Sequence, residues 1–154
     1  MVILMLLGLT WTVWRYIGLI FCLVIVAWVD SRSMIIPDEA QLIIVLLAFL
    51  RLPVEGWLGV IDGLIGALAV LLPVFLLVGL MNKVFKRETM GGGDLKLLTG
   101  LGLHFGAAGV WQVLTIACWL ALPIALYQRN KQREIPFAPF LTVSAIAEIL
   151  NIFG

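Results

Sequence analysis

Long apolar runs separated by short polar links are the feature that most constrains what this chain can fold into. The first run extends from the N-terminus to Val29, and its only charged residue is Arg15. A helix that spans a bilayer needs roughly 20 mostly apolar residues, so this run is long enough to cross. It has neither a charged leading region nor a small-residue cleavage site, so we do not expect a signal peptide that is removed.

The composition also favours a membrane protein. Hydrophobic residues make up 63% of the 154 residues and charged residues only 12%. Soluble domains have about 45–50% apolar and about 25% charged residues, and disordered chains are more polar still. We therefore expect an integral membrane protein with the lipid bilayer as its surroundings and almost no mass outside it. The net charge of +1 provides no basic surface for nucleic acid.

Six apolar segments predict an all-α, polytopic fold with about six transmembrane helices joined by short links. We expect one transmembrane domain over residues 1–154. The segments are 12–29, 40–52, 57–81, 95–105, 107–127 and 137–153. The third contains Pro73, which predicts a tilt or kink. The fourth is rich in glycine and too short to cross alone.

Basic residues gather in alternate links. Eight of the ten Lys and Arg lie in or next to the first, third and fifth links, so the positive-inside rule places these links in the cytoplasm and both termini outside. The eight are Arg32, Lys83, Lys86, Arg87, Lys96, Arg129, Lys131 and Arg133. The other two, Arg15 and Arg51, fall toward the outer side, and Arg15 is expected to snorkel to the surface.

The two cysteines, Cys22 and Cys118, both lie inside apolar runs. They indicate neither a disulfide framework nor a zinc cluster. We expect no metal and no cofactor.

Two of the nine acidic residues stand out, because carboxylates at membrane depth are expensive and usually functional. Asp30 ends the first apolar segment, and Asp94 follows Gly91, Gly92 and Gly93 at the start of the fourth. They lie 64 positions apart, yet the predicted topology brings both to the cytoplasmic face. Taken alone, Asp30 could be an interfacial charge at a helix end and Asp94 an N-cap.

The other acids have mainly structural interpretations. Asp38 follows Pro37 and resembles the N-cap of the second helix, with Gln41 as its capping-box partner. The remaining acids are expected to be solvated, to lie in a first helical turn, or to pair with neighbouring helices: Glu39, Glu55, Asp62, Glu88, Glu134 and Glu148.

Two carboxylates beside one water are the minimum for aspartyl proteolysis. The ionised one takes a proton from the water, and the protonated one hydrogen-bonds the scissile carbonyl and later donates its proton. Glycines beside one of them let an extended peptide approach the backbone closely. Helix dipoles favour the anion at Asp94, at a helix start, and the neutral acid at Asp30, at a helix end.

Three blocks of sequence resemble the type IV prepilin peptidase family, the bacterial branch of the GxGD membrane aspartyl proteases. DSRSMIIPD at 30–38 is similar to the family's Asp, six residues, then Pro-Asp or Pro-Asn. GGGDLKLL at 91–98 is similar to GxGDxKLL, and IPFAPFL at 135–141 is similar to IPFGPFL. The blocks occur in the family's order and spacing, and the likeness extends from about Tyr16 to the C-terminus.

The resemblance implies an endopeptidase with Asp30 and Asp94 as its catalytic pair. Its partner would be a prepilin or pseudopilin, whose basic leader it would remove at the cytoplasmic face of the bacterial inner membrane, typically after a glycine. By motif position, the residues that bind substrate or shape the site would be Gly91, Gly92, Gly93, Lys96, Pro37 and Asp38.

The sequence departs from the family pattern in two ways. Longer members carry a cytoplasmic domain with paired CxxC motifs, linked to N-methylation of the new terminus. This sequence has no such motif, so we expect peptidase activity alone. Ala138 stands where glycine is usual, and this change is expected to touch no titrating group.

Other functional classes stay open. Intramembrane acids can form a relay in a small proton-coupled transporter or channel subunit. A non-enzymatic membrane assembly factor could use Gly59 and Gly63 to pack helices closely. If the protein is a peptidase, a basic leader needs acids to steer it, and the candidates are Glu88, Glu134 and Asp38.

Overall fold

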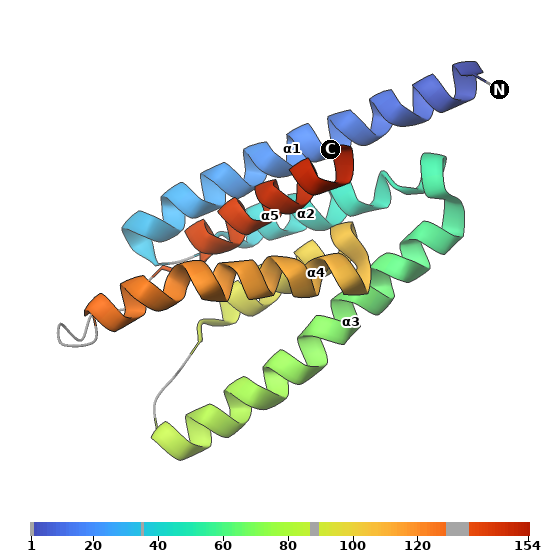
Figure 1. Cartoon of the computed structure of the whole chain (residues 1–154). Coiled ribbons are helices and arrows are strands. Elements are labelled where there is room, and N and C mark those ends of the chain that lie inside the picture. Colours follow the sequence, from blue (N-terminus) through green and yellow to red (C-terminus); the bar gives the residue numbers. More distant parts are fainter. Residues whose placement is uncertain (1, 35, 87–89, 129–135) are drawn as a thin grey trace.

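The computed structural model describes residues 2–34, 36–86, 90–128 and 136–154, and in these ranges the fold is all-α (Figure 1). Its elements are α1 (Val2–Ser33), α2 (Asp38–Phe49), α3 (Leu52–Phe85), α4 (Gly92–Gln128) and α5 (Ala138–Phe153). The predicted all-α class is confirmed.

Two glycines divide the long helices at the places where the sequence predicted links. Gly56 in α3 (φ 65°, ψ −161°) and Gly106 in α4 (φ 69°, ψ −173°) have non-helical backbone. The fourth and fifth predicted segments are therefore the two arms of α4, before and after Gly106. At Pro73, where the sequence predicted a tilt or kink, α3 continues without a break. The non-helical residue in α3 is Gly56.

Small residues let α3 and α4 pack at backbone distance. A Cβ atom added at Gly66 would lie 2.4 Å from the carbonyl carbon of Gly106, and one added at Gly102 would lie 2.7 Å from the Cα of Ala67. One added at Gly63 would lie 2.5 Å from the carbonyl oxygen of Leu103. Interfaces between membrane helices are often built in this way, with small residues that let the two backbones approach closely. Gly63 therefore serves packing within the chain.

The helix ends that frame the candidate site gather at one end of the bundle. In Figure 1 the end of α1, the start of α2, the start of α4 and the start of α5 lie on the left, and the N-terminus lies far to the right. Three helical stretches, Gly8–Ser33, Leu52–Val84 and Gly92–Tyr127, are long and apolar enough to cross a membrane. Since α2 and α5 have 12 and 16 residues, the six-span topology stays a prediction.

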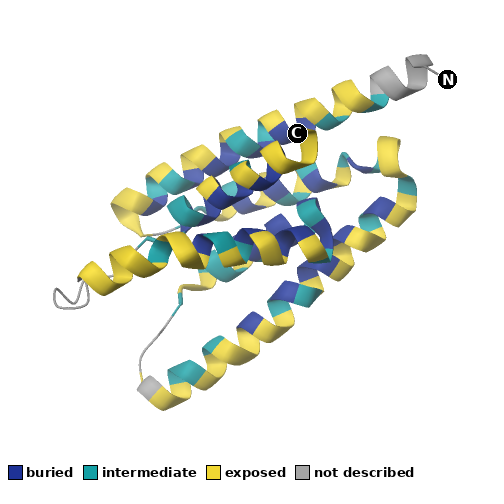
Figure 2. Cartoon of the chain, viewed as in Figure 1, coloured by how far each residue is buried: buried dark blue, intermediate teal, exposed yellow. Residues whose placement is uncertain are grey.

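Buried residues lie on the helix faces that meet inside the bundle, and exposed residues lie on the outer faces (Figure 2). Many of the exposed residues are large and apolar. Leu19 and Leu23 of α1 and Leu97 and Leu101 of α4 are fully buried. Exposed residues include Phe21, at 68%. An apolar exterior of this extent is what a bilayer would cover.

Ion pairs between two buried arginines and exposed acids hold the other end of the bundle, and here one expectation was wrong. Arg15 does not snorkel, because it is only 3% exposed and its Nη1 lies 3.4 Å from Glu55 Oε1. Glu55 is exposed, as expected, and Arg51 Nε also donates to its Oε2 at 2.8 Å. Arg51 Nη2 also lies 3.5 Å from Oδ2 of Asp62, an exposed acid of α3, the helix whose N-cap is Arg51 itself.

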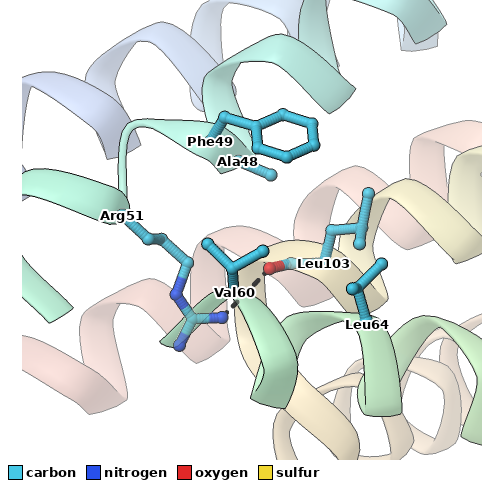
Figure 3. Close-up of a pocket in the computed structure, with 6 residues that line it drawn as sticks. All are labelled: Ala48, Phe49, Arg51, Val60, Leu64 and Leu103. Carbon is cyan, nitrogen blue, oxygen red and sulfur yellow. Dashed lines mark hydrogen bonds between the residues drawn. The ribbon is translucent and has the colours of Figure 1, made fainter. Parts of the chain in front are cut away.

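Arg51 also caps the first arm of α4. Its Nη1 donates to the carbonyl oxygen of Leu103 at 3.0 Å (Figure 3). Leu103 lies in the last turn before Gly106, where carbonyls lack partners within the helix. The side chains around this contact enclose a cavity of about 20 Å³, lined by Ala48, Phe49, Arg51, Val60, Leu64 and Leu103.

Candidate active site

Asp30 lies in the last turn of α1 and is buried, with 5% of its surface exposed. Its Oδ2 accepts a hydrogen bond of 3.3 Å from the backbone N–H of Ala138, the first residue of α5. The first N–H groups of a helix have no partner within the helix, so α5 offers a free donor here. The carboxyl group is therefore held by an element 108 residues further along the chain.

Asp94 is the third residue of α4 and not its N-cap, because the helix already begins at Gly92. The residue is half-buried, and its Oδ1 is buried without a hydrogen-bond partner among the residues that the structure describes. Its carboxyl group interacts electrostatically with that of Asp30. The fold thus brings together the two acids that the sequence singled out, and leaves one oxygen available to a further group.

The three glycines before Asp94 differ in what they contribute. A Cβ atom added at Gly93 would lie 3.1 Å from Cβ of Ile36, so this position needs a small residue for packing. A Cβ atom at Gly92 would meet nothing within 4 Å, and one at Gly91 would meet only Asp94 Oδ2, at 3.9 Å. Gly91 and Gly92 are exposed and leave open space beside the carboxyl group.

Asp38 is not the N-cap of α2, contrary to one expectation. Pro37 occupies that position, with extended backbone and no side-chain cap. Asp38 Oδ1 instead accepts from Lys96 Nζ of α4 at 2.7 Å. Both side chains of this pair are exposed, and exposed ion pairs contribute about 0–1 kcal/mol to the stability of a protein. The pair therefore links the starts of α2 and α4 but adds little to the free energy of unfolding.

Gln41 makes a second link between the same two helices. It is buried, and its Nε2 donates to the carbonyl oxygen of Gly93 at 3.2 Å. Sequence reasoning had paired Gln41 with Asp38 as a capping box. The actual contact could not be read from local spacing, because its partner lies 52 positions away.

Ala138 makes a contact with Asp30 that the sequence did not predict, because its backbone N–H donates to the Asp30 carboxyl group. The alanine methyl group is not part of this contact, since glycine would supply the same N–H. The third block, which begins just before α5, therefore lies against the first. The steering candidates Glu88 and Glu134 lie outside the described residues, as do Arg87, Arg129, Lys131 and Arg133.

The chemistry open to this arrangement is that of two carboxyl groups acting on a polar group between them. Within the described ranges, no group of three or more His, Cys, Asp and Glu could hold a metal ion. Asp30 and Asp94 can transfer protons and form hydrogen bonds, and Lys96 and exposed backbone at Gly91 and Gly92 lie in the same part of the structure.

Residues 17–126 match the type IV leader peptidase family. The chain belongs to this family. No solved structure matches it.

Curated relatives in the family carry the name prepilin leader peptidase/N-methyltransferase. A protein from Pectobacterium carotovorum subsp. carotovorum is 26% identical over 157 residues, covering 96% of this chain and 56% of its own length. One from Dickeya chrysanthemi is 29% identical over 147 residues, covering 90% and 52%. One from Vibrio cholerae is 28% identical over 140 residues, covering 88% and 55%. The chain spans about half the length of these relatives.

Proposed function

We propose that this member of the type IV leader peptidase family is a membrane-embedded aspartyl endopeptidase. It removes the basic leader of type IV prepilins or pseudopilins at the cytoplasmic face of the bacterial inner membrane, using Asp30, Asp94 and a water. The observation that carries the proposal is that α1 and α4 place these two carboxyl groups near enough to interact electrostatically, and that Asp94 Oδ1 is buried without a hydrogen-bond partner in the described part of the chain. The names of the relatives support the choice of substrate.

The two acids take distinct roles in this proposal. Asp30 accepts a hydrogen bond from the backbone N–H of Ala138. A hydrogen bond to a charged group contributes about 1.5–3 kcal/mol to stability. A helix dipole typically contributes about 0.3–1 kcal/mol, and up to about 2 kcal/mol for a partly buried group such as Asp94, so the two contributions are comparable. We therefore propose that the pair shares one proton: the ionised acid takes a proton from water, and the protonated acid hydrogen-bonds the scissile carbonyl.

The surrounding residues have supporting roles in this proposal. Gly91 and Gly92 leave room for an extended peptide, and Gly93 and Pro37 set the packing of the loop and of the start of α2. Lys96 and Asp38 hold the starts of α2 and α4 together, and either could contact the substrate when their pair opens.

The test is cleavage of a co-expressed full-length prepilin. Asp30→Asn and Asp94→Asn should each abolish processing, because neither amide can exchange a proton with the water. Electrophoretic mobility and N-terminal sequencing of the pilin measure the outcome, and membrane fractionation checks that each variant accumulates.

Glu39→Gln is the matched control, since Glu39 is an exposed acid in the first turn of α2 at the same end of the bundle. This variant should process the prepilin as the wild type does. Full processing by either Asn variant would refute the proposal. Proton-dependent flux without cleavage would indicate a transporter instead.

A further inference from the structure

A groove runs along the bundle beside the candidate active site. It has a volume of about 490 Å³ and lies between α2 and the first arm of α4, with Leu71 of α3 at one side. Binding pockets for ligands commonly have volumes of about 300–1,000 Å³. In Figure 1 the second half of α3 runs away from α4.

The groove walls are continuous helical stripes. On α2 the stripe includes Gln41, Leu42 and Val45, and on α4 it includes Lys96, Thr99 and Leu103. Residues three and four apart share one face of a helix. The stretch from Lys96 to Leu103 corresponds to about 10 Å along the helix axis. The groove therefore extends from the helix starts at the active-site end into the apolar part of the bundle.

The chemistry of the walls indicates what the groove can hold. Its deep part is apolar, whereas Gln41 and Thr99 bring polar groups one turn or more inside the helix starts. Gln41 donates through Nε2 and Thr99 through its hydroxyl, but the amide oxygen and the hydroxyl oxygen can each still accept. A polypeptide backbone can donate to such acceptors, and a lipid acyl chain cannot.

The groove begins at the helix turn that carries the proposed catalytic Asp94. Leu95, which lines the groove, follows Asp94 directly, and the paired side chains of Asp38 and Lys96 also line it. We propose that this groove binds a membrane-inserted apolar segment of the substrate polypeptide and selects the residues on the apolar side of the cleaved bond. The inference rests on the proposed peptidase function and adds the site that positions the substrate.

The first test narrows the groove. Val45→Trp places an indole on its α2 wall, and Ile43→Trp is the control, because Ile43 is 47% exposed on another face of the same helix. For a full-length prepilin in detergent, Val45→Trp should raise KM about tenfold, equivalent to about 1.4 kcal/mol, with kcat little changed. Ile43→Trp should change neither. A short soluble peptide that ends just beyond the cleaved bond should be cut equally well by all three proteins.

The second test does not depend on whether the Val45→Trp variant folds. A photo-crosslinking residue is placed at position 45 or 43 of the Asp94→Asn variant, which holds the prepilin uncut. An adduct with the prepilin from position 45 but not from 43 supports the groove. Adducts with lipid alone at position 45, or equal prepilin adducts at both, overturn it.

The two proposals can fail separately. If the wild type cuts neither the prepilin nor the peptide, the proposed function itself is wrong. If the wild type cuts the prepilin and Val45→Trp has the KM of Ile43→Trp, only the groove is wrong. Should Val45→Trp fail to accumulate, the crosslinks decide.

Discussion

Single backbone and side-chain contacts decide how the candidate site is built. Asp30 depends on a backbone N–H, which any residue other than proline at position 138 would supply. This explains why alanine in place of the usual glycine at 138 is compatible with the site. Ala138→Gly keeps the donor and should leave processing intact.

Gly93 and Gly92 are adjacent residues with different space around them. Gly93→Ala should destabilise the protein, because its Cβ would lie 3.1 Å from Cβ of Ile36, and overpacking costs about 1–3 kcal/mol. Gly92→Ala meets nothing within 4 Å and should be neutral or stabilising by about 0.4–1 kcal/mol. Thermal denaturation in detergent measures both.

The double variant Ile36→Ala/Gly93→Ala separates crowding from other effects. Removing the atoms of Ile36 that face position 93 should make the cost of Gly93→Ala smaller than it is in the wild type. An unchanged cost would show that the contact with Ile36 does not explain the need for glycine.

At the scale of elements, the break in α4 governs how the bundle is assembled. Gly106 reverses the chain between the two arms, Arg51 caps the last turn of the first arm, and Gly66 allows α3 to pack against the break. The first arm carries Asp94 at its start, so the position of this arm bears on the candidate site.

Gly106 and Gly56 form a natural pair for testing this. Both have backbone angles that are nearly restricted to glycine, so alanine should cost about 1–3 kcal/mol at either position. At Gly106 the added Cβ would also lie 2.4 Å from Asp62 Oδ2, whereas at Gly56 it meets nothing within 4 Å. Gly106→Ala should therefore lower the melting temperature more than Gly56→Ala. Equal decreases would contradict the crowding argument.

At the scale of the whole molecule, orientation in the membrane is the property to test. We predict that the end holding Asp30 and Asp94 faces the cytoplasm. Most of the basic residues lie in or next to the first, third and fifth predicted links, which the positive-inside rule places on that side. With Cys22 and Cys118 replaced by alanine, a cysteine is introduced at exposed Ser33 or at exposed Asn151.

A membrane-impermeant maleimide applied to intact spheroplasts should label the cysteine at 151 and spare the one at 33. Permeabilised cells should show labelling at both positions, which controls for reactivity. The reverse pattern in intact spheroplasts would mean that the candidate site faces outward, and the proposed cytoplasmic cleavage would be wrong.

Apolar length and glycine placement carried most of the helix prediction. Segment 107–127 matches the second arm of α4, and 137–153 differs from α5 by one residue at its start. Helix ends were less well predicted, since α1 continues to Ser33 and α3 starts at Leu52. The polar residues at 30–33 belong to the last turn of α1, so the end of the apolar run did not mark the end of the helix.

The class of fold, the division into apolar helices and the candidates Asp30 and Asp94 could be predicted from local composition and from motifs within a few residues. The contacts that these residues make depend on the packing of the helices: Ala138 with Asp30, Lys96 with Asp38, Gly93 with Gln41 and Glu55 with Arg15. These pairs join residues 40 to 108 positions apart. Local spacing carries no information about which helix faces meet, since that depends on how all the helices pack at once.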